Sequence, residues 1–292
     1  MQVPHAVDAA QALERRFKDE YAPLLPREER VLQPPEALFD GRRVLVTGAD
    51  GFLGRRIAER LDELGAHAYL TDLHDLDVSD GELTDGMFRQ LRPDFVIHLA
   101  AMKHAPLGEI QPLETTEVNV IGTSNVVEAA KSVGVDAGHL VFGSTCKAAA
   151  PETVYGATKL LGERIALAAG YSAVRYANVL GSTGSVLEIW TAQAANGDDL
   201  SVTPCKRYWL TPPEAVGLTL AAIGLGPGLY HLDAGVPEPV AELARRFDPT
   251  ASLLDIPPRR GDRLVERFLA DGERTEATSV PHVLRIHETW ET

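Results

Sequence analysis

A glycine-rich turn between an apolar strand and a helix is the feature that most constrains how this chain can fold. RRVLVTG (42–48) is a short apolar run, and FLGRRIAERLDELG (52–65) carries apolar side chains at helical spacing. Gly48, Gly51 and Gly54 lie at the junction, spaced Gly-x-x-Gly-x-x-Gly. Glycine permits the positive φ of a tight turn and the close approach of a pyrophosphate, which a helix N-terminus attracts. In this strand–turn–helix context the glycines predict a dinucleotide site.

An acidic residue at the end of the next predicted strand indicates which dinucleotide binds. HAYLTD (67–72) reads as a second strand and ends at Asp72, about 20 residues after the turn. A carboxylate there holds both ribose hydroxyls and repels a 2′-phosphate, which favours NAD over NADP. Asp77 and Val78 follow closely, and we expect them to border the adenine.

The chain continues as an alternation of strands and helices. DFVIHLAA (94–101) and HLVFGST (139–145) read as strands, and residues 112–134 and 155–170 carry helical patterns. Such alternation implies right-handed crossovers and a parallel sheet covered on both faces. We therefore predict an α/β fold.

Three parts are expected along the chain. Residues 1–40 are expected to form an amphipathic helical arm followed by a linker that contains several prolines. The arm packs either on the body of the protein or on a second subunit. Residues 41–177 form the dinucleotide-binding sheet domain. The regularity weakens after Tyr176, which predicts a smaller, irregular lobe over 178–292 for the substrate.

Composition excludes several classes of protein. Lys+Arg 28 against Asp+Glu 42 gives a net charge of −14, which argues against a nucleic-acid partner. Two cysteines make no disulfide framework, and no Cys/His spacing suggests a metal site. We find no signal peptide and no stretch able to span a bilayer, so we expect a cytoplasmic protein without a membrane partner.

Several motifs together resemble the extended short-chain dehydrogenase/reductase family. They are TGADGFLG, HLAA and the Tyr-x-x-x-Lys pattern of Tyr155-Gly-Ala-Thr-Lys159. AAMKHAPLGEIQPLETTEVNVIGTSNVVEAA, VRYANVLGSTGSV, RYWLTPPEAV and PPRRGDRLVE are similar to its polysaccharide-biosynthesis branch, which contains inverting UDP-N-acetylglucosamine 4,6-dehydratases. The resemblance runs from about Leu24 to Glu266. It implies a Rossmann-type doubly wound parallel sheet that holds NAD and a smaller C-terminal lobe that holds a nucleotide sugar.

One departure from that branch concerns the chemistry. Where the branch has Ser-Thr-Asp-Lys, this chain has Ser144-Thr145-Cys146-Lys147. The segment Gly-Ser-Thr-Cys also resembles that of the sugar-nucleotide 5,6-dehydratase of tunicamycin biosynthesis. The departure leaves open whether the product is a 4-keto-6-deoxy sugar or a 5,6-alkene.

Five residues are expected to perform the chemistry. Tyr155 and Lys159 share one helix face, and we expect the ammonium to lower the phenol pKa from about 10 so that Tyr155 accepts a sugar hydroxyl proton. Thr145 orients that hydroxyl. Lys147, when neutral, removes the C–H proton beside the resulting ketone, and the Cys146 thiol protonates the departing hydroxyl. Cys146 and Lys147 form a coupled pair, because a charged Lys147 favours thiolate.

The remaining candidates bind rather than react. The predicted cofactor residues are Gly48, Asp50, Gly51, Phe52, Leu53, Gly54, Asp72, Asp77, Val78, Ala100, Ala101, Lys103, Asn119, Tyr155 and Lys159. The predicted substrate residues are Lys103, His104, Asn178, Arg207 and Arg259, since the planar guanidinium suits phosphate. Cys205, Trp190 and Trp209 are assigned to the core.

Four functions remain open from the sequence. The first is an NAD-dependent sugar-nucleotide dehydratase, of the 4,6- or 5,6-type. The second is a nucleotide-sugar epimerase, which uses the same ketone without losing water. The third is a dehydratase of a sugar-bearing nucleoside or antibiotic precursor, and the fourth is a non-catalytic NAD-binding sensor. We expect a homo-oligomer in each case.

Overall fold

The structure, a computed structural model, describes residues 21–33, 35–258 and 262–288. These residues divide into two units, and each unit is assembled from separate stretches of chain. The larger unit takes its described residues from 31–176, 213–233 and 267–292, and the smaller from 1–30, 177–212 and 234–266. The predicted arm over residues 1–20 lies outside the described residues.

A twisted sheet forms the larger unit, with its strands in the order β13-β14-β10-β5-β4-β3-β1-β2. Six of these strands are parallel, namely β1 (Arg43–Thr47), β2 (His67–Thr71), β3 (Phe95–His98), β4 (Leu140–Thr145), β5 (Ser172–Tyr176) and β10 (Gly228–Leu232). The last two, β13 (Glu273–Ala277) and β14 (Val283–Glu288), form an antiparallel hairpin along β10. β2 lies on one side of β1 and β3 lies on the other, so the direction in which strands are added to the sheet reverses there. The carboxyl ends of β1 and β3 therefore border a topological switch point.

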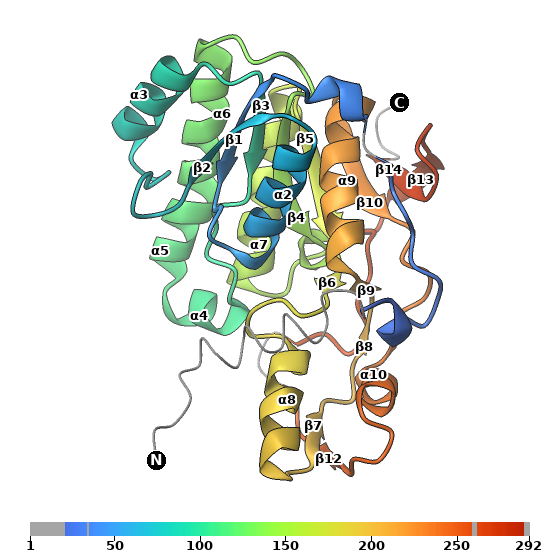
Figure 1. Cartoon of the computed structure of the whole chain (residues 1–292). Helices are drawn as coiled ribbons and strands as arrows, with labels where there is room; N and C mark the ends of the chain where they lie inside the picture. The colour runs from blue at the N-terminus through green and yellow to red at the C-terminus, as the bar shows by residue number, and fades with distance from the viewer. Residues whose placement is uncertain (1–20, 34, 259–261, 289–292) are drawn as a thin grey trace, which may run out of the picture. The chain divides into compact units, whose positions relative to one another are not determined.

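Helices cover both faces of this sheet. Figure 1 shows α2 (Phe52–Glu63) and α9 (Pro212–Leu225) over one face, and α3 (Gly81–Leu91), α6 (Gly122–Ser132) and α7 (Val154–Ala168) over the other. The core under α3, α6 and α7 is built from strand and helix residues, among them Leu45, Phe88, Val96, Val126 and Phe142. This arrangement confirms the predicted doubly wound α/β fold.

The region predicted as one long helix, residues 112–134, is divided into three pieces. Short α4 (Ala105–Ile110) precedes α5 (Pro112–Thr116), which passes through a π-helical turn, η3 (Glu117–Ile121), into α6. Single π turns inside α-helices are frequent at functional sites. Here the turn contains the buried Asn119.

The smaller unit has short strands and a core of its own. Its elements are η1 (Ala22–Leu24), β6 (Asn178–Val179), α8 (Val186–Asn196), β7 (Leu200–Val202), β8 (Lys206–Arg207), β9 (Trp209–Leu210), β11 (Glu238–Pro239), α10 (Val240–Phe247) and β12 (Leu253–Asp255). Trp190, Trp209 and Cys205 are buried in its core together with Tyr21 and Leu24. The two tryptophans and Cys205 are therefore core residues, as predicted.

The domain boundary differs from the single break predicted near residue 177. β10, β13 and β14 come from the stretch assigned to the substrate lobe, yet they complete the sheet of the larger unit. Without them β5 would be an edge strand with unpaired backbone groups, which favours the return of the chain to the sheet. Over the described residues, no helix has the length and apolar character needed to cross a membrane.

Candidate functional site

The predicted glycine turn forms between β1 and α2. Gly48 has φ +72°, and a Cβ there would lie 2.6 Å from the backbone nitrogen of Ala100. A Cβ at Gly54 would lie 2.5 Å from the carbonyl oxygen of Gly48. Gly51 precedes Phe52 as the N-cap of α2 and provides no side-chain cap, so it leaves the first N–H groups of the helix to a ligand. This cradle fits the pyrophosphate of a dinucleotide.

Asp72 directly follows β2 and lies beside that turn. Its carboxylate accepts hydrogen bonds from the backbone N–H of Asp50 at 3.0 Å and of Leu73 at 2.8 Å. Each oxygen retains a second lone pair, so Asp72 fits the paired hydroxyls of a ribose. The carboxylate of Asp77, by contrast, accepts both the N–H and the hydroxyl of Ser79, and the Val78 side chain is buried in the core.

Asn119 acts as a clamp behind the loop that follows β3. Its Oδ1 accepts from the N–H of Met102 at 2.7 Å, and its Nδ2 donates to the Met102 carbonyl and to Thr158 Oγ1. The amide is therefore occupied with holding the loop against α7. Ala100 and Ala101 are half-buried in this loop, whereas Lys103 and His104 are exposed just before α4.

A buried histidine that the sequence analysis missed lies under the same loop. His98 Nδ1 contacts Thr47 Oγ1 at 2.7 Å, and Nε2 contacts Thr123 Oγ1 at 3.1 Å. The Thr123 hydroxyl donates to the Asn119 carbonyl, so it accepts from His98 Nε2–H, and Thr47 donates to Nδ1. Burial, followed by the charge of Lys159, lowers the pKa of His98 to about 3, so the ring is neutral.

Four of the five predicted catalytic residues meet at the end of β4. Thr145 is the last residue of that strand and accepts the N–H of Lys147 at 3.3 Å. Its side chain also hydrogen-bonds to the phenol of Tyr155, in the first turn of α7. The charge of Lys147 and, when its thiol is ionised, that of Cys146 act on Tyr155. Cys146 has no exposed surface, and Lys147 is half-buried.

The predicted effect of Lys159 on Tyr155 was wrong. Burial raises the pKa of Tyr155, and the cation that opposes this rise is Lys147, helped by the hydrogen bond from Thr145. Lys159 is itself buried, which lowers its own pKa to about 7 against the attraction of Glu163. At neutral pH it therefore carries only part of a charge. Its ammonium lies 4.1 Å from the centre of the Phe142 ring.

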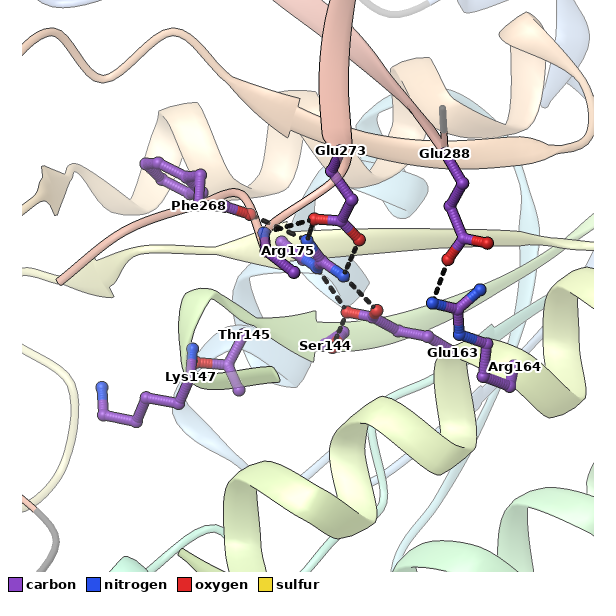
Figure 2. A network of polar contacts seen from close by, with 10 residues as sticks. Ser144, Thr145, Lys147, Glu163, Arg164, Arg175, Phe268, Glu273 and Glu288 are labelled. Atoms are coloured by element: carbon purple, nitrogen blue, oxygen red, sulfur yellow. Dashed lines mark hydrogen bonds and ion pairs between the residues drawn. The ribbon is translucent and has the colours of Figure 1, made fainter. Parts of the chain in front are cut away.

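A charged network that the sequence analysis also missed lies beside these residues (Figure 2). Arg175 of β5 pairs with Glu163 of α7 and with Glu273 of β13, and all three side chains are at most 2% exposed. Glu163 also accepts the hydroxyl of Ser144, the neighbour of Thr145, at 2.6 Å. The sequence feature that could have indicated this network is Glu163, which follows Lys159 by four residues and therefore lies on the same helix face.

The smaller unit contains two of the predicted substrate residues. Arg207 donates to the carbonyl of Arg263 at 2.6 Å and lies 3.4 Å from a carboxylate oxygen of Glu266. The other oxygen of Glu266 accepts from Asn178 Nδ2 at 2.6 Å. Glu266 thus brings Arg207 and Asn178 together. Arg259 lies outside the described residues.

Comparisons with known proteins agree with this architecture. The profile of a family described as polysaccharide biosynthesis protein matches residues 71–288. The probable polysaccharide biosynthesis protein EpsC of Bacillus subtilis is 35% identical over 242 residues, which cover 71% of this chain and 40% of EpsC. An inverting UDP-N-acetylglucosamine 4,6-dehydratase of Campylobacter jejuni is 29% identical over 270 residues, covering 81% of this chain and 80% of that enzyme.

Solved structures share the fold. The UDP-glucose 4-epimerase of Thermus thermophilus, solved in complex with NAD, superimposes with a TM-score of 0.69 at 24% identity. The match covers 77% of this chain and 89% of that one. The chain spans two fifths of the length of EpsC, so the relatives establish the family and the fold rather than a whole protein's activity.

Proposed function

The chain belongs to the polysaccharide biosynthesis protein family of extended short-chain dehydrogenases/reductases, and on that premise we propose that it is an NAD-dependent dehydratase of a nucleotide sugar. The observation that carries the proposal is the hydrogen-bonded pair of Thr145 and Tyr155, with Lys147 and Cys146 beside it. The family relatives include dehydratases and epimerases that act on UDP-sugars. The chain's own residues supply an acid–base set suited to elimination.

The larger unit provides the cofactor site in this proposal. The turn at Gly48, Gly51 and Gly54 receives the pyrophosphate, and Asp72 holds the adenosine ribose and disfavours a 2′-phosphate. Lys159 holds the second ribose. NAD, when bound, would take up a hydride from the sugar carbon and would return it, to the terminal carbon or to the original carbon, after the hydroxyl has left, so that the net change is the loss of one water.

The residues at the end of β4 and the start of α7 then move protons. Thr145 orients the sugar hydroxyl, and Tyr155 accepts its proton as the carbon is oxidised to a ketone. The ketone acidifies the adjacent C–H bond, and Lys147 removes that proton. Lys147 lowers the pKa of Tyr155 while it is charged and is a base only when neutral, so the two groups titrate as a coupled pair.

Cys146 is the proposed acid for the departing hydroxyl. A thiol with a pKa near 8.5 is mostly protonated at pH 7, whereas an ordinary aspartate is not. The complete burial of Cys146 argues for a second role as a packing residue. Cys146→Ala separates the two, because a chemical role slows elimination more than the initial oxidation, whereas a packing role slows both equally.

In the smaller unit, Arg207 and Asn178 are proposed to bind the nucleoside diphosphate. Glu266, which is buried, holds both side chains in place. The planar guanidinium can engage two phosphate oxygens at once. A diphosphate would replace the looser ion pair that Arg207 makes with Asp262 at 3.7 Å.

Tyr155→Phe tests the proposal. We expect the variant to lose about 100-fold or more of its turnover of UDP-sugars while it keeps bound NAD. The matched control is Tyr171→Phe, which removes another phenol hydroxyl of the larger unit, one that donates to the Val135 carbonyl. Turnover in Tyr155→Phe equal to that of the control would overturn the role of Tyr155.

The mass of the product distinguishes the remaining functions. A dehydratase removes one water from the substrate, and an epimerase leaves the mass unchanged. Turnover of a nucleoside but of no sugar nucleotide would identify the third function. Bound NAD without turnover of either class would identify a sensor.

A further inference from the structure

One buried carboxylate connects two parts of the site that the mechanism treats separately. Glu163 is 1% exposed and lies one helical turn beyond Lys159 on α7. Its Oε1 accepts from Ser144 Oγ at 2.6 Å and from Arg175 Nε at 2.9 Å, and its Oε2 accepts from Arg175 Nη2 at 2.8 Å. Figure 2 shows the carboxylate between the end of β4 and the guanidinium.

The charges around Arg175 do not balance. Its N–H groups donate twice to Glu163, twice to Glu273 and once to the Phe268 carbonyl, which uses all five donors. One positive charge is thus shared by two carboxylates in the interior. The network carries a net negative charge that favours a cation nearby.

Arg164, which pairs with Glu288, is one such cation, because Glu163 and Glu273 also act on it. The buried one is Lys159. The titratable and charged groups that face it are Glu163 on its own helix and His98 on β3, which is neutral. On β4 it meets the ring of Phe142. Glu163 is therefore the carboxylate that attracts its ammonium.

The same carboxylate restrains the strand end where Thr145 lies. Ser144 pairs with Arg175 in the β4–β5 ladder, and Thr145 pairs with Tyr176. The backbone of β4 is thus held by the ladder and the side chain of Ser144 by Glu163. The next residue, Thr145, makes the hydrogen bond to Tyr155.

We propose that Glu163 is a positioning residue that couples the two halves of the catalytic group: it holds the end of β4 through Ser144 and the ammonium of Lys159 through its charge. This inference rests on the proposed function for its meaning in catalysis. Its structural content is independent of turnover and is tested without it.

The charge on Lys159 is measured directly by NMR. The chain has six lysines, so a sample labelled with [¹³Cε]lysine gives few signals, and Lys159→Arg assigns the one of interest. In Glu163→Gln we expect the titration midpoint of Lys159 to fall by about one pH unit, because the attracting carboxylate is gone. The matched control is Glu273→Gln, which removes the other partner of Arg175 and shifts the midpoint less. Equal shifts in the two variants, or none, would overturn the coupling to Lys159.

Ser144→Ala tests the other connection and leaves the carboxylate in place. We expect the Lys159 midpoint to stay unchanged and the Lys147 amide, which donates to Thr145 Oγ1, to exchange its hydrogen about tenfold faster. An unchanged exchange rate would contradict the restraint of the strand end. This variant keeps the inference testable if Glu163→Gln does not fold.

Catalysis provides a separate measurement. If the proposed function holds, the alkaline limb of the kcat profile moves to lower pH in Glu163→Gln and less in Glu273→Gln, while KM changes little. A wild-type protein that turns over no sugar nucleotide would refute the proposed function and leave the NMR result standing.

Discussion

Two buried polar networks lie under the candidate site of the larger unit, and they differ in charge. The network beneath the loop after β3 joins Thr47, His98, Thr123 and Asn119 through neutral groups. The network beside β4 joins Ser144 to Glu163, Arg175 and Glu273 through ion pairs. Both connect strand ends to helices.

The difference separates two tasks. A neutral network of satisfied donors and acceptors fixes the shape of a loop and has no charge to pass on, which suits a wall of the cofactor site. A network with an excess carboxylate fixes shape and also sets the charge of a neighbour, here Lys159. If this contrast is correct, the two networks respond differently to the loss of one member.

The largest effect is expected from the centre of the charged network. Arg175→Met leaves Glu163 and Glu273 buried without their cation and should lower the free energy of unfolding by about 3–5 kcal/mol. Urea denaturation measures this loss. The control is Arg164→Met, whose partner is Glu288 and whose side chain is 47% exposed, with an expected loss below about 1 kcal/mol. Similar losses in both variants would contradict the importance of burial.

The neutral network should lose less. Asn119→Ala leaves the Met102 N–H and carbonyl without their partner and should cost about 2 kcal/mol in the same denaturation experiment. Asn125→Ala is the control, because Asn125 donates to the carbonyls of Val78 and Ser79 from a half-buried position where water can replace it. A larger loss of stability in Asn125→Ala than in Asn119→Ala would contradict the role of Asn119 in holding the loop after β3.

Acid should reveal the neutral histidine. The pKa of His98 is lowered to about 3 by burial and by Lys159, so between pH 3 and about 6.5 the unfolded chain binds a proton that the folded chain does not. Stability therefore falls as pH drops through this window, by about 1.4 kcal/mol per pH unit from this group. His98→Gln should flatten that part of the stability curve. A slope equal to that of the wild type would mean that His98 is protonated in the folded state.

The smallest effect concerns a redundant contact. Thr158→Val removes one acceptor of Asn119 Nδ2, which still donates to the Met102 carbonyl. We expect a loss of about 0.5–1 kcal/mol. Thermal denaturation of this variant and of Asn119→Ala compares the two losses of stability. A loss as large as that of Asn119→Ala would mean that Asn119 stabilises the fold mainly through its bond to Thr158 on α7 and not through its bonds to the loop.

The predictable part of the site depends on short spacings. The turn at Gly48, the carboxylate of Asp72 and the four-residue interval from Tyr155 to Lys159 are local patterns. The structure places the first two at the ends of β1 and β2 and the pair on α7, as expected. The strands β1 to β4 are apolar runs and were predicted for the same reason.

The rest depends on contacts between distant segments. Glu273 meets Arg175 across 98 residues, and β13 reads ERTEA, whose exposed charges carry no strand signal. Spacing also could not show that Lys159 is buried and Tyr155 half-buried, and desolvation raises the pKa of Tyr155 where a decrease was expected. Nor does a helical pattern reveal the π turn that places Asn119.

The late position of Glu273 has a consequence for how this protein is made. A growing chain leaves the ribosome N-terminus first, and Arg175 is synthesised together with most of the sheet. The acid that completes its ion pairs emerges 98 residues later, on the hairpin that closes the edge of β10. Until then the nascent sheet holds a guanidinium with only two of its five hydrogen bonds, those to Glu163, so the buried network cannot be completed before β13 is translated.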